Sequence, residues 1–116
     1  MTDLAQFILA RIAEDETAAL EAEEARGSRG WLLADDMVDY GATPPAVAEH
    51  IARHDPARVL AECEAKRRIV ELCEIVADLP DVDTSAFTLA LNTLEDLARP
   101  YADHPDHRAD WWEPRQ

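Results

Sequence analysis

The dipeptide Asp55-Pro56 and the apolar pattern after it constrain the fold of this chain more than any other feature. Asp55 suits the N-cap of a helix, and Pro56 at the first helical position needs no hydrogen-bonded N–H. The pattern predicts a long central helix over 56–77 with one broad apolar stripe turned inward. That stripe comprises Val59, Leu60, Cys63, Val70, Cys73 and Ala77, and it is widened by Ile69, Leu72 and Val76.

The N-terminal residues predict a second long helix. Thr2 or Asp3 can cap it, and Gly27 ends it after about Ala25. Residues 17–24 are nearly all Ala and Glu, so we expect this second half of the helix to be exposed. The expected inward face comprises Leu4, Phe7, Ile8, Ile12 and Ala19.

The segment between these two helices is less regular. In residues 31–40, two short apolar runs flank a pair of aspartates, which fits either a short β-hairpin or one irregular helical turn. The two prolines that follow favour a short helix over 45–53. We expect Val47 and Ile51 to face inward from it.

A third long helix is predicted over 85–98. Asp83 or Thr84 can cap it, and Pro100 follows its end. Its inward face is predicted to comprise Phe87, Leu91, Leu94 and Ala98.

The residues after this helix are not typical of a disordered tail. Tyr101, Trp111 and Trp112 are three of only seven aromatic residues in the chain. Large rings usually cover other apolar groups, so we expect a short final helix, starting at Pro105, to lay them on the bundle.

The predicted fold is therefore mainly α: one helical domain over residues 1–116, built as a small bundle of three long helices and one short helix, with the alternative of a hairpin at 31–40. A chain of 116 residues can bury one core. Only three glycines argue against a sheet with many tight turns.

The chain is strongly acidic, with a formal net charge of −14. Such a charge repels phosphates and anionic lipid headgroups, which argues against direct nucleic-acid or membrane binding. It keeps a protein soluble, and it is compatible with docking onto a basic face of a partner protein. We see no signal peptide and no membrane span, and expect a cytoplasmic protein.

Two cysteines, Cys63 and Cys73, are separated by ten residues of the central helix. At 1.5 Å per residue they lie roughly 15 Å apart, beyond the reach of a disulfide. Reduced cysteines fit a cytoplasmic compartment. We interpret both as small apolar core residues, since no base is close in sequence.

Four histidines form two pairs that are candidate metal ligands. His50 and His54 are spaced i,i+4, and His104 and His107 are spaced i,i+3 beside aspartates. If the two pairs met in the fold, Cys73 or an aspartate could complete a tetrahedral zinc site. The alternative is that these are surface and cap-region histidines, because the short helix can end before His54.

The basic run Lys66-Arg67-Arg68 is a candidate contact site for a small anion or a carboxylate-bearing partner. Glu62, Glu64, Glu71 and Glu74 surround it in sequence, so a solvated, salt-bridged helix face is the alternative. Trp111 and Trp112 are further candidate contact residues.

The block from His50 to Val70, His-Ile-Ala-Arg-His-Asp-Pro-Ala-Arg-Val-Leu, then Glu-x-Glu-Ala-Lys-Arg-Arg-Ile-Val, resembles a family of small proteins of unknown function from high-GC actinobacteria and their phages. The opening Met1-Thr-Asp-Leu with Phe7, and Pro100-Tyr-Ala-Asp-His-Pro-Asp106, resemble that family's first and last motifs. Many family members carry a Cys-rich stretch that hints at metal, whereas residues 75–92 of this chain have no cysteine.

No phosphate loop, dinucleotide fingerprint or nucleophile elbow occurs in the sequence. We therefore predict a non-enzymatic, acidic protein-interaction module without a cofactor, such as a phage-encoded accessory or host-modulating factor. A protein partner is expected, and a homo-oligomer is compatible with the sequence. The alternatives are a small zinc-binding protein that uses the four histidines and an acidic mimic of nucleic acid.

Overall fold

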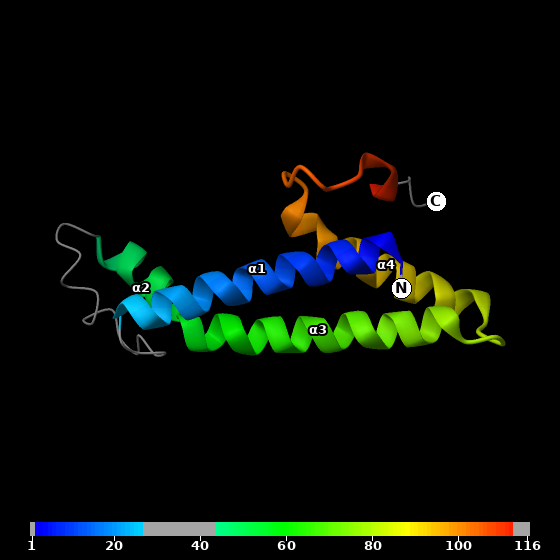
Figure 1. Cartoon of the computed structure of the whole chain (residues 1–116), viewed down its shortest axis with the longest axis horizontal. Coiled ribbons are helices and arrows are strands. Elements are labelled where there is room, and N and C mark those ends of the chain that lie inside the picture. The colour runs from blue at the N-terminus through cyan, green and yellow to red at the C-terminus, as the bar shows by residue number, and fades with distance from the viewer. Residues whose placement is uncertain (1, 27–43, 113–116) are drawn as a thin grey trace. The chain divides into compact units, whose positions relative to one another are not determined.

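The computed structural model describes residues 2–26 and 44–112, apart from the side chains of Arg26 and Trp112. These residues contain no strand, so the prediction of a mainly α fold is confirmed, while the predicted hairpin at 31–40 lies outside them. None of the helices described is long and apolar enough to cross a membrane. The elements are α1 (Asp3–Arg26), α2 (Pro45–Arg53), α3 (Pro56–Asp78) and α4 (Thr84–Ala98), then the 3₁₀ turns η2 (Arg99–Tyr101) and η3 (Ala109–Trp112) (Figure 1).

Side-chain caps fix where three of these helices begin. The side chains of Thr2, Asp55 and Asp83 each accept a hydrogen bond from the backbone N–H three residues further on, at 3.1, 2.9 and 2.8 Å. Each bond satisfies a donor that the first turn of a helix leaves without an intrahelical partner. The predicted caps of all three long helices are therefore confirmed.

The chain divides into two compact units. The terminal unit comprises residues 1–12 and 65–116, and the middle unit comprises residues 13–64. Both α1 and α3 contribute residues to each unit.

The core of the terminal unit is built from the start of α1, the second half of α3, and α4. Ile8, Ile12, Val70 and Leu94 are at most 1% exposed. Burying one such side chain contributes about 1.5–3 kcal/mol. Leu4, Ala5, Phe7, Cys73, Ala90 and Ala98 complete this core.

One part of the predicted inward stripe on α3 is wrong. Leu72 is 62% exposed and Ile69 is 39% exposed. The apolar residues between 69 and 79 cover more than half of the circumference of α3, so their spacing alone does not identify the inward face. Phe87 of α4, also expected to face inward, is 38% exposed.

The middle unit buries small side chains. Ala48 and Ala52 of α2 are buried, whereas Val47 is 46% exposed, so the prediction that Val47 faces inward is wrong. Alanines spaced i,i+4 share one face of a helix and allow a close approach of its neighbour. Among the described residues of this unit, Ala19 of α1 and Cys63 of α3 are also buried.

The segment after α4 differs from the single final helix that was predicted at Pro105. It forms η2 and η3, linked by turns in which the N–H of His104 donates to the carbonyl of Tyr101 and the N–H of His107 donates to that of His104, each at 3.0 Å. The backbone N–H of Asp106 donates instead to Nδ1 of His104 at 3.0 Å, a local side-chain bond that competes with helix formation. The expectation that the aromatic residues here cover apolar groups is confirmed, because Tyr101 and Trp111 both pack against Phe7.

Candidate protein-interaction surface

The second half of α3 has two apolar faces, and one of them is turned to solvent. Val70 and Cys73 point into the core. On the other face, Leu72, Ile75 and Leu79 are 62, 59 and 50% exposed. Their spacing of i, i+3 and i+7 places all three in one row along the helix. A row of half-exposed aliphatic side chains is unusual on a solvated helix, whose outer face normally carries polar residues.

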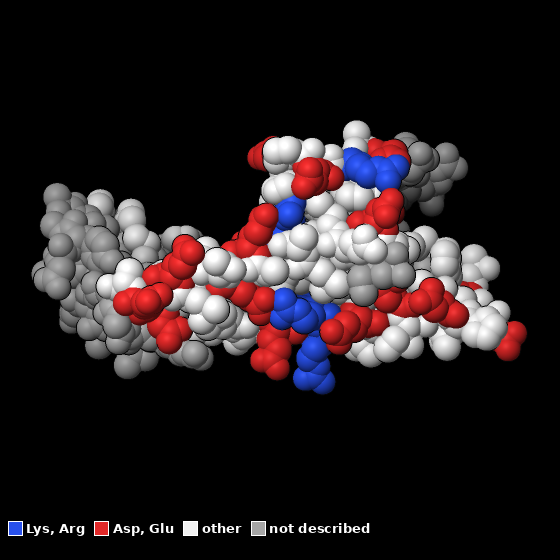
Figure 2. All heavy atoms as spheres, in the orientation of Figure 1, with Lys and Arg blue, Asp and Glu red and all other residues white. Residues whose placement is uncertain are grey.

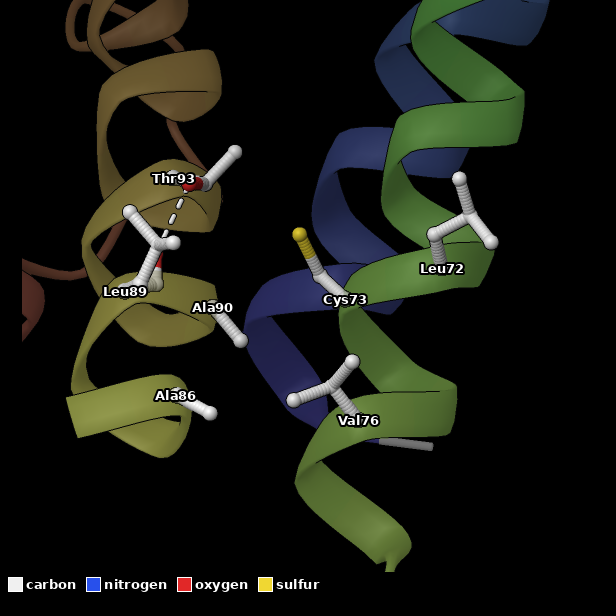
Figure 3. A pocket seen from close by; sticks show the side chains of 7 residues that line it. All are labelled: Leu72, Cys73, Val76, Ala86, Leu89, Ala90 and Thr93. Carbon is white, nitrogen blue, oxygen red and sulfur yellow. Dashed lines mark hydrogen bonds between the residues drawn. The ribbon is translucent and has the colours of Figure 1, made fainter. Parts of the chain in front are cut away.

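This row borders an apolar groove between α3 and α4. The groove has a volume of about 220 Å³. Figure 3 shows Cys73 and Val76 of α3 and Ala90 of α4 pointing into the space between the two helices. On the α4 side, Leu89 is 68% exposed. The complete lining is Leu72, Cys73, Val76, Ala86, Leu89, Ala90 and Thr93. We call the row and the groove together the α3–α4 apolar face.

Cys73 contributes an uncharged thiol to the lining of this groove. Burial raises the pKa of its thiol, and the negative charge of Glu74 raises it further, while a hydrogen bond with Thr93 acts in the opposite direction. A raised pKa keeps the thiol protonated near neutral pH, and the thiolate is the form that reacts as a nucleophile. Cys63 and Cys73 are both free and buried, as predicted for core cysteines. The groove therefore has an uncharged lining of aliphatic groups, one thiol and one hydroxyl.

Charged residues of opposite sign lie near the two ends of the exposed row. Arg68 precedes the row and Asp78 lies beside its last residue, Leu79; both are exposed, as is Glu71. Lys66 and Arg67 are half-buried. Glu74, which follows this basic run in sequence, is buried and accepts a hydrogen bond of 2.8 Å from the hydroxyl of Thr2.

The acidic charge is unevenly divided along the chain. The middle unit carries 13 acidic and four basic residues, a net of −9, and the terminal unit carries 12 acidic and seven basic residues, a net of −5. On the face visible in Figure 2, the described carboxylates are spread over many places, whereas Lys and Arg are gathered at a few. The apolar face therefore belongs to the less acidic unit.

The predicted ligands His104 and His107 pack against α1. Their rings each lie 5.7 Å from that of Phe7, in edge-on arrangements. The buried guanidinium of Arg11 lies 5.0 Å from the same Phe7 ring and contacts the ring nitrogens of His104, at 2.6 Å to Nδ1. The tail and α1 are joined at this cluster, which gives both histidines a structural role.

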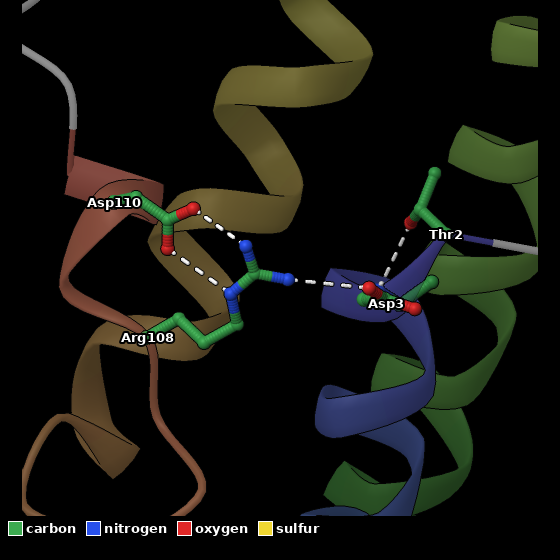
Figure 4. Close-up of polar contacts among 5 residues, drawn as sticks. Thr2, Asp3, Arg108 and Asp110 are labelled. Atoms are coloured by element: carbon green, nitrogen blue, oxygen red, sulfur yellow. Dashed lines mark hydrogen bonds and ion pairs between the residues drawn. The ribbon is translucent and has the colours of Figure 1, made fainter.

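Trp111, a predicted contact residue, belongs to the same cluster. Its ring lies 5.1 Å from that of Phe7 and 5.3 Å from that of His107. Arg108 ties this segment to the start of α1 through Asp3 at 3.2 Å and is bonded to Asp110 at 2.6 Å (Figure 4). These carboxylates, Asp110 first, raise the pKa of Arg108. Trp111 is half-buried, and the side chain of Trp112 lies outside the described part of the chain.

His50 and His54 are neighbours in space, although α2 ends at Arg53 and His54 follows it as the C-cap. Their ring centroids are 4.6 Å apart, and both residues are exposed. Within residues 2–26 and 44–112, no group of three or more His, Cys, Asp and Glu side chains is arranged to hold a metal ion. The zinc site stays a prediction, with this pair as its nearest geometric basis.

The residues of the α3–α4 apolar face were not among the predicted site residues. The sequence contained a signal, because the apolar residues between 69 and 79 together cover about 220° of the helix circumference at 100° per residue. An apolar surface of that width exceeds the stripe that one core-facing side of a helix needs. That signal was interpreted as one wide inward stripe.

Comparison with known proteins identifies the family of the chain. No curated protein and no solved structure matches it. A family model described as a family of unknown function, DUF6221, matches residues 1–113. Because that match covers nearly the whole chain, the protein belongs to the DUF6221 family.

Proposed function

We propose that this protein works through protein–protein contact rather than catalysis, and that the α3–α4 apolar face is its contact surface. The single observation behind the proposal is the exposed row of Leu72, Ile75 and Leu79 beside an apolar groove. Contiguous exposed apolar surface on a small protein commonly marks an interaction site.

The energetics of the face support this role. Leu72, Ile75, Leu79 and Leu89 are each at least half exposed. Covering such a side chain contributes roughly 1 kcal/mol at about 25 cal/mol per Å² of apolar area. Four of them together supply a useful part of the free energy of a protein contact, and they surround a groove that a partner's side chain can fill.

The narrower role that we propose is an accessory or host-modulating factor encoded by a phage. Its support is the resemblance to proteins of actinobacteria and their phages, together with the acidic charge, which favours a partner with a basic rim around an apolar centre. The acidic mimic of nucleic acid stays a prediction.

Site-specific photo-crosslinking in cells that express the chain tests the contact surface. Leu72 is replaced with the photo-reactive amino acid benzoylphenylalanine, and Leu20, which is 47% exposed in the middle unit, is replaced in the matched control. We expect protein adducts from position 72 and none, or far fewer, from position 20. Equal yields at both positions, or no adduct at position 72, would contradict the proposal.

The zinc alternative has one observation in its favour, the 4.6 Å separation of the His50 and His54 rings. Two histidines are fewer than the four ligands of a structural zinc site, so water or a further side chain would complete the coordination. Titration with Co²⁺ and metal analysis of the purified chain test it. Stoichiometric metal that is lost in His50→Ala would support this function, and a metal-free chain that gives no Co²⁺ spectrum would remove it.

A further inference from the structure

The outward face of α3 is complementary to the same face of a second copy when the two α3 helices run antiparallel. A basic residue, Arg68, stands one turn before the aliphatic row, and an acidic residue, Asp78, stands near its C-terminal end, next to Leu79. From this pattern we infer that the occupant of the α3–α4 apolar face is a second copy of this chain, with the two α3 helices packed antiparallel around a two-fold axis near Cys73 and Glu74. This inference rests on the proposed function, since it names the partner for the same surface.

The spacing along α3 fits a two-fold axis at this point. In such a contact the two copies are related by a two-fold rotation. A residue that lies a given number of positions before the axis therefore comes level with the residue that lies the same number after it in the second copy. Arg68 and Asp78 stand five residues on either side of Cys73, so each Arg68 comes level with Asp78 of the second copy. The same axis places Leu72 within one or two residues of the level of Ile75 and Val76 of the second copy, and Ile69 within two residues of the level of Leu79.

Both members of the charged pair fall on one side of the helix. At 100° per residue, Arg68 and Asp78 are separated by about 80° around α3. When the two-fold axis is perpendicular to the plane that contains both antiparallel helices, residues above that plane in one copy are also above it in the other. The guanidinium and the carboxylate can therefore pair across the contact, whereas a parallel arrangement would set Arg68 against Arg68.

The net charge of α3 around the proposed contact is zero, so two copies can approach there although the whole chain is acidic. Residues 66–79 carry Lys66, Arg67 and Arg68 against Glu71, Glu74 and Asp78, which makes this stretch neutral. Nine of the 14 net negative charges belong to the middle unit. Exposed charges further apart than about 8 Å are largely screened at physiological ionic strength.

The groove next to the row completes the fit. Leu72 and Val76 form its α3 wall, and Leu89 and Ala90 lie on its α4 side (Figure 3). When two α3–α4 pairs meet face to face, four helices surround one apolar centre, with helix axes about 20° from antiparallel. The groove of about 220 Å³ then receives aliphatic side chains of the second copy.

Sedimentation equilibrium of the full chain tests the inference. We expect a species of twice the 13.0 kDa chain mass that dissociates on dilution. Leu72→Gln with Leu79→Gln should give a monomer with an unchanged helical circular dichroism spectrum, because both side chains are at least half exposed. Leu20→Gln with Val47→Gln is the matched control, since those exposed residues belong to the middle unit, and it should leave the dimer intact.

A charge exchange tests the antiparallel orientation. Arg68→Glu and Asp78→Arg should each weaken the dimer by about tenfold, because two symmetry-related pairs become repulsive. The double variant should recover affinity to within a few-fold of the original chain. Two weakened single variants without recovery would overturn the antiparallel register.

If the chain stays monomeric up to several hundred micromolar, the second-copy inference is overturned. It is also overturned if the chain dimerises and the double variant Leu72→Gln with Leu79→Gln dimerises equally well. The mass of the photo-adduct at position 72 distinguishes failure of the second-copy inference from failure of the proposed protein-contact function. An adduct of twice the chain mass supports a second copy. An adduct with a different protein from a monomeric chain overturns the inference and leaves the interaction surface standing. No adduct at position 72 overturns both.

Discussion

Leu72 and Cys73 are consecutive residues of α3, yet Leu72 is 62% exposed and Cys73 is 9% exposed. Adjacent positions on a helix point 100° apart, so one helix can serve the core with one face and a partner with another. α3 presents one apolar face to the core and another to solvent over the same few turns. We expect changes on the inner face to affect folding and changes on the outer face to affect association.

The hydrogen bond between Thr2 and Glu74 should contribute measurably to folding. Glu74 is only 7% exposed and accepts the Thr2 hydroxyl at 2.8 Å. Glu74→Ala should lower the free energy of unfolding by about 1–3 kcal/mol, because the bond and its packing are lost. Urea denaturation at one fixed protein concentration measures this. The control Glu71→Ala, at an exposed position, should change the value by less than about 0.5 kcal/mol; equal effects of the two variants would argue against a role for Glu74.

Phe7 should be the residue that most firmly holds the segment after α4. Its ring contacts those of Tyr101, His104, His107 and Trp111. Phe7→Ala should lower the free energy of unfolding by about 3 kcal/mol or more, as expected for a buried aromatic residue. It should also speed hydrogen exchange of backbone amides in residues 101–112. Phe87→Ala, at a site that is 38% exposed, should have a much smaller effect and should leave exchange in this segment unchanged.

Cys73 should make the stability of the fold decrease in alkaline solution. Its pKa is raised in the folded chain, chiefly by burial. A group with a raised folded pKa stabilises the fold fully below the pKa of the unfolded thiol, about 8.5. That contribution is lost as the pH rises from there through the folded pKa, because the unfolded chain releases its proton first.

The measurement is the free energy of unfolding of the original chain and of Cys73→Ala between about pH 7 and pH 10. The difference between the two isolates Cys73 from other groups that titrate in this range. We expect the advantage of the original chain over Cys73→Ala to shrink above about pH 8.5. A difference that is constant with pH would show that the thiol is not perturbed by folding.

Much of the fold could be predicted because it is encoded locally. Asp55 and Asp83 are strong N-cap residues, and the structure uses both side chains as caps. The aromatic residues after α4 were expected to cover apolar groups, and Tyr101 and Trp111 do so at Phe7. Local capping chemistry and ring size do not depend on tertiary context, which is why these predictions hold.

The exposed apolar face that we propose as an interaction surface could not be predicted, because it depends on which side of α3 the other helices cover. Leu72 and Val70 are equally apolar, and only the positions of α1 and α4 distinguish them. The same reason explains Val47, which gives way to Ala48 and Ala52 as the inward residues of α2. The burial of Glu74 was also missed, because its partner Thr2 is 72 residues away in sequence.

Side-chain footprinting of the unmodified chain tests whether the α3–α4 apolar face is the surface through which the chain contacts a second copy. Hydroxyl-radical oxidation rates would be measured by mass spectrometry at low and high protein concentration. We predict protection of Leu72, Ile75 and Leu79 as concentration rises, with unchanged rates at Leu20 and Val47. If the chain associates but the three α3 residues are oxidised at equal rates at both concentrations, this face is not the contact surface. Protection confined to Leu20 and Val47 would lead to the same conclusion.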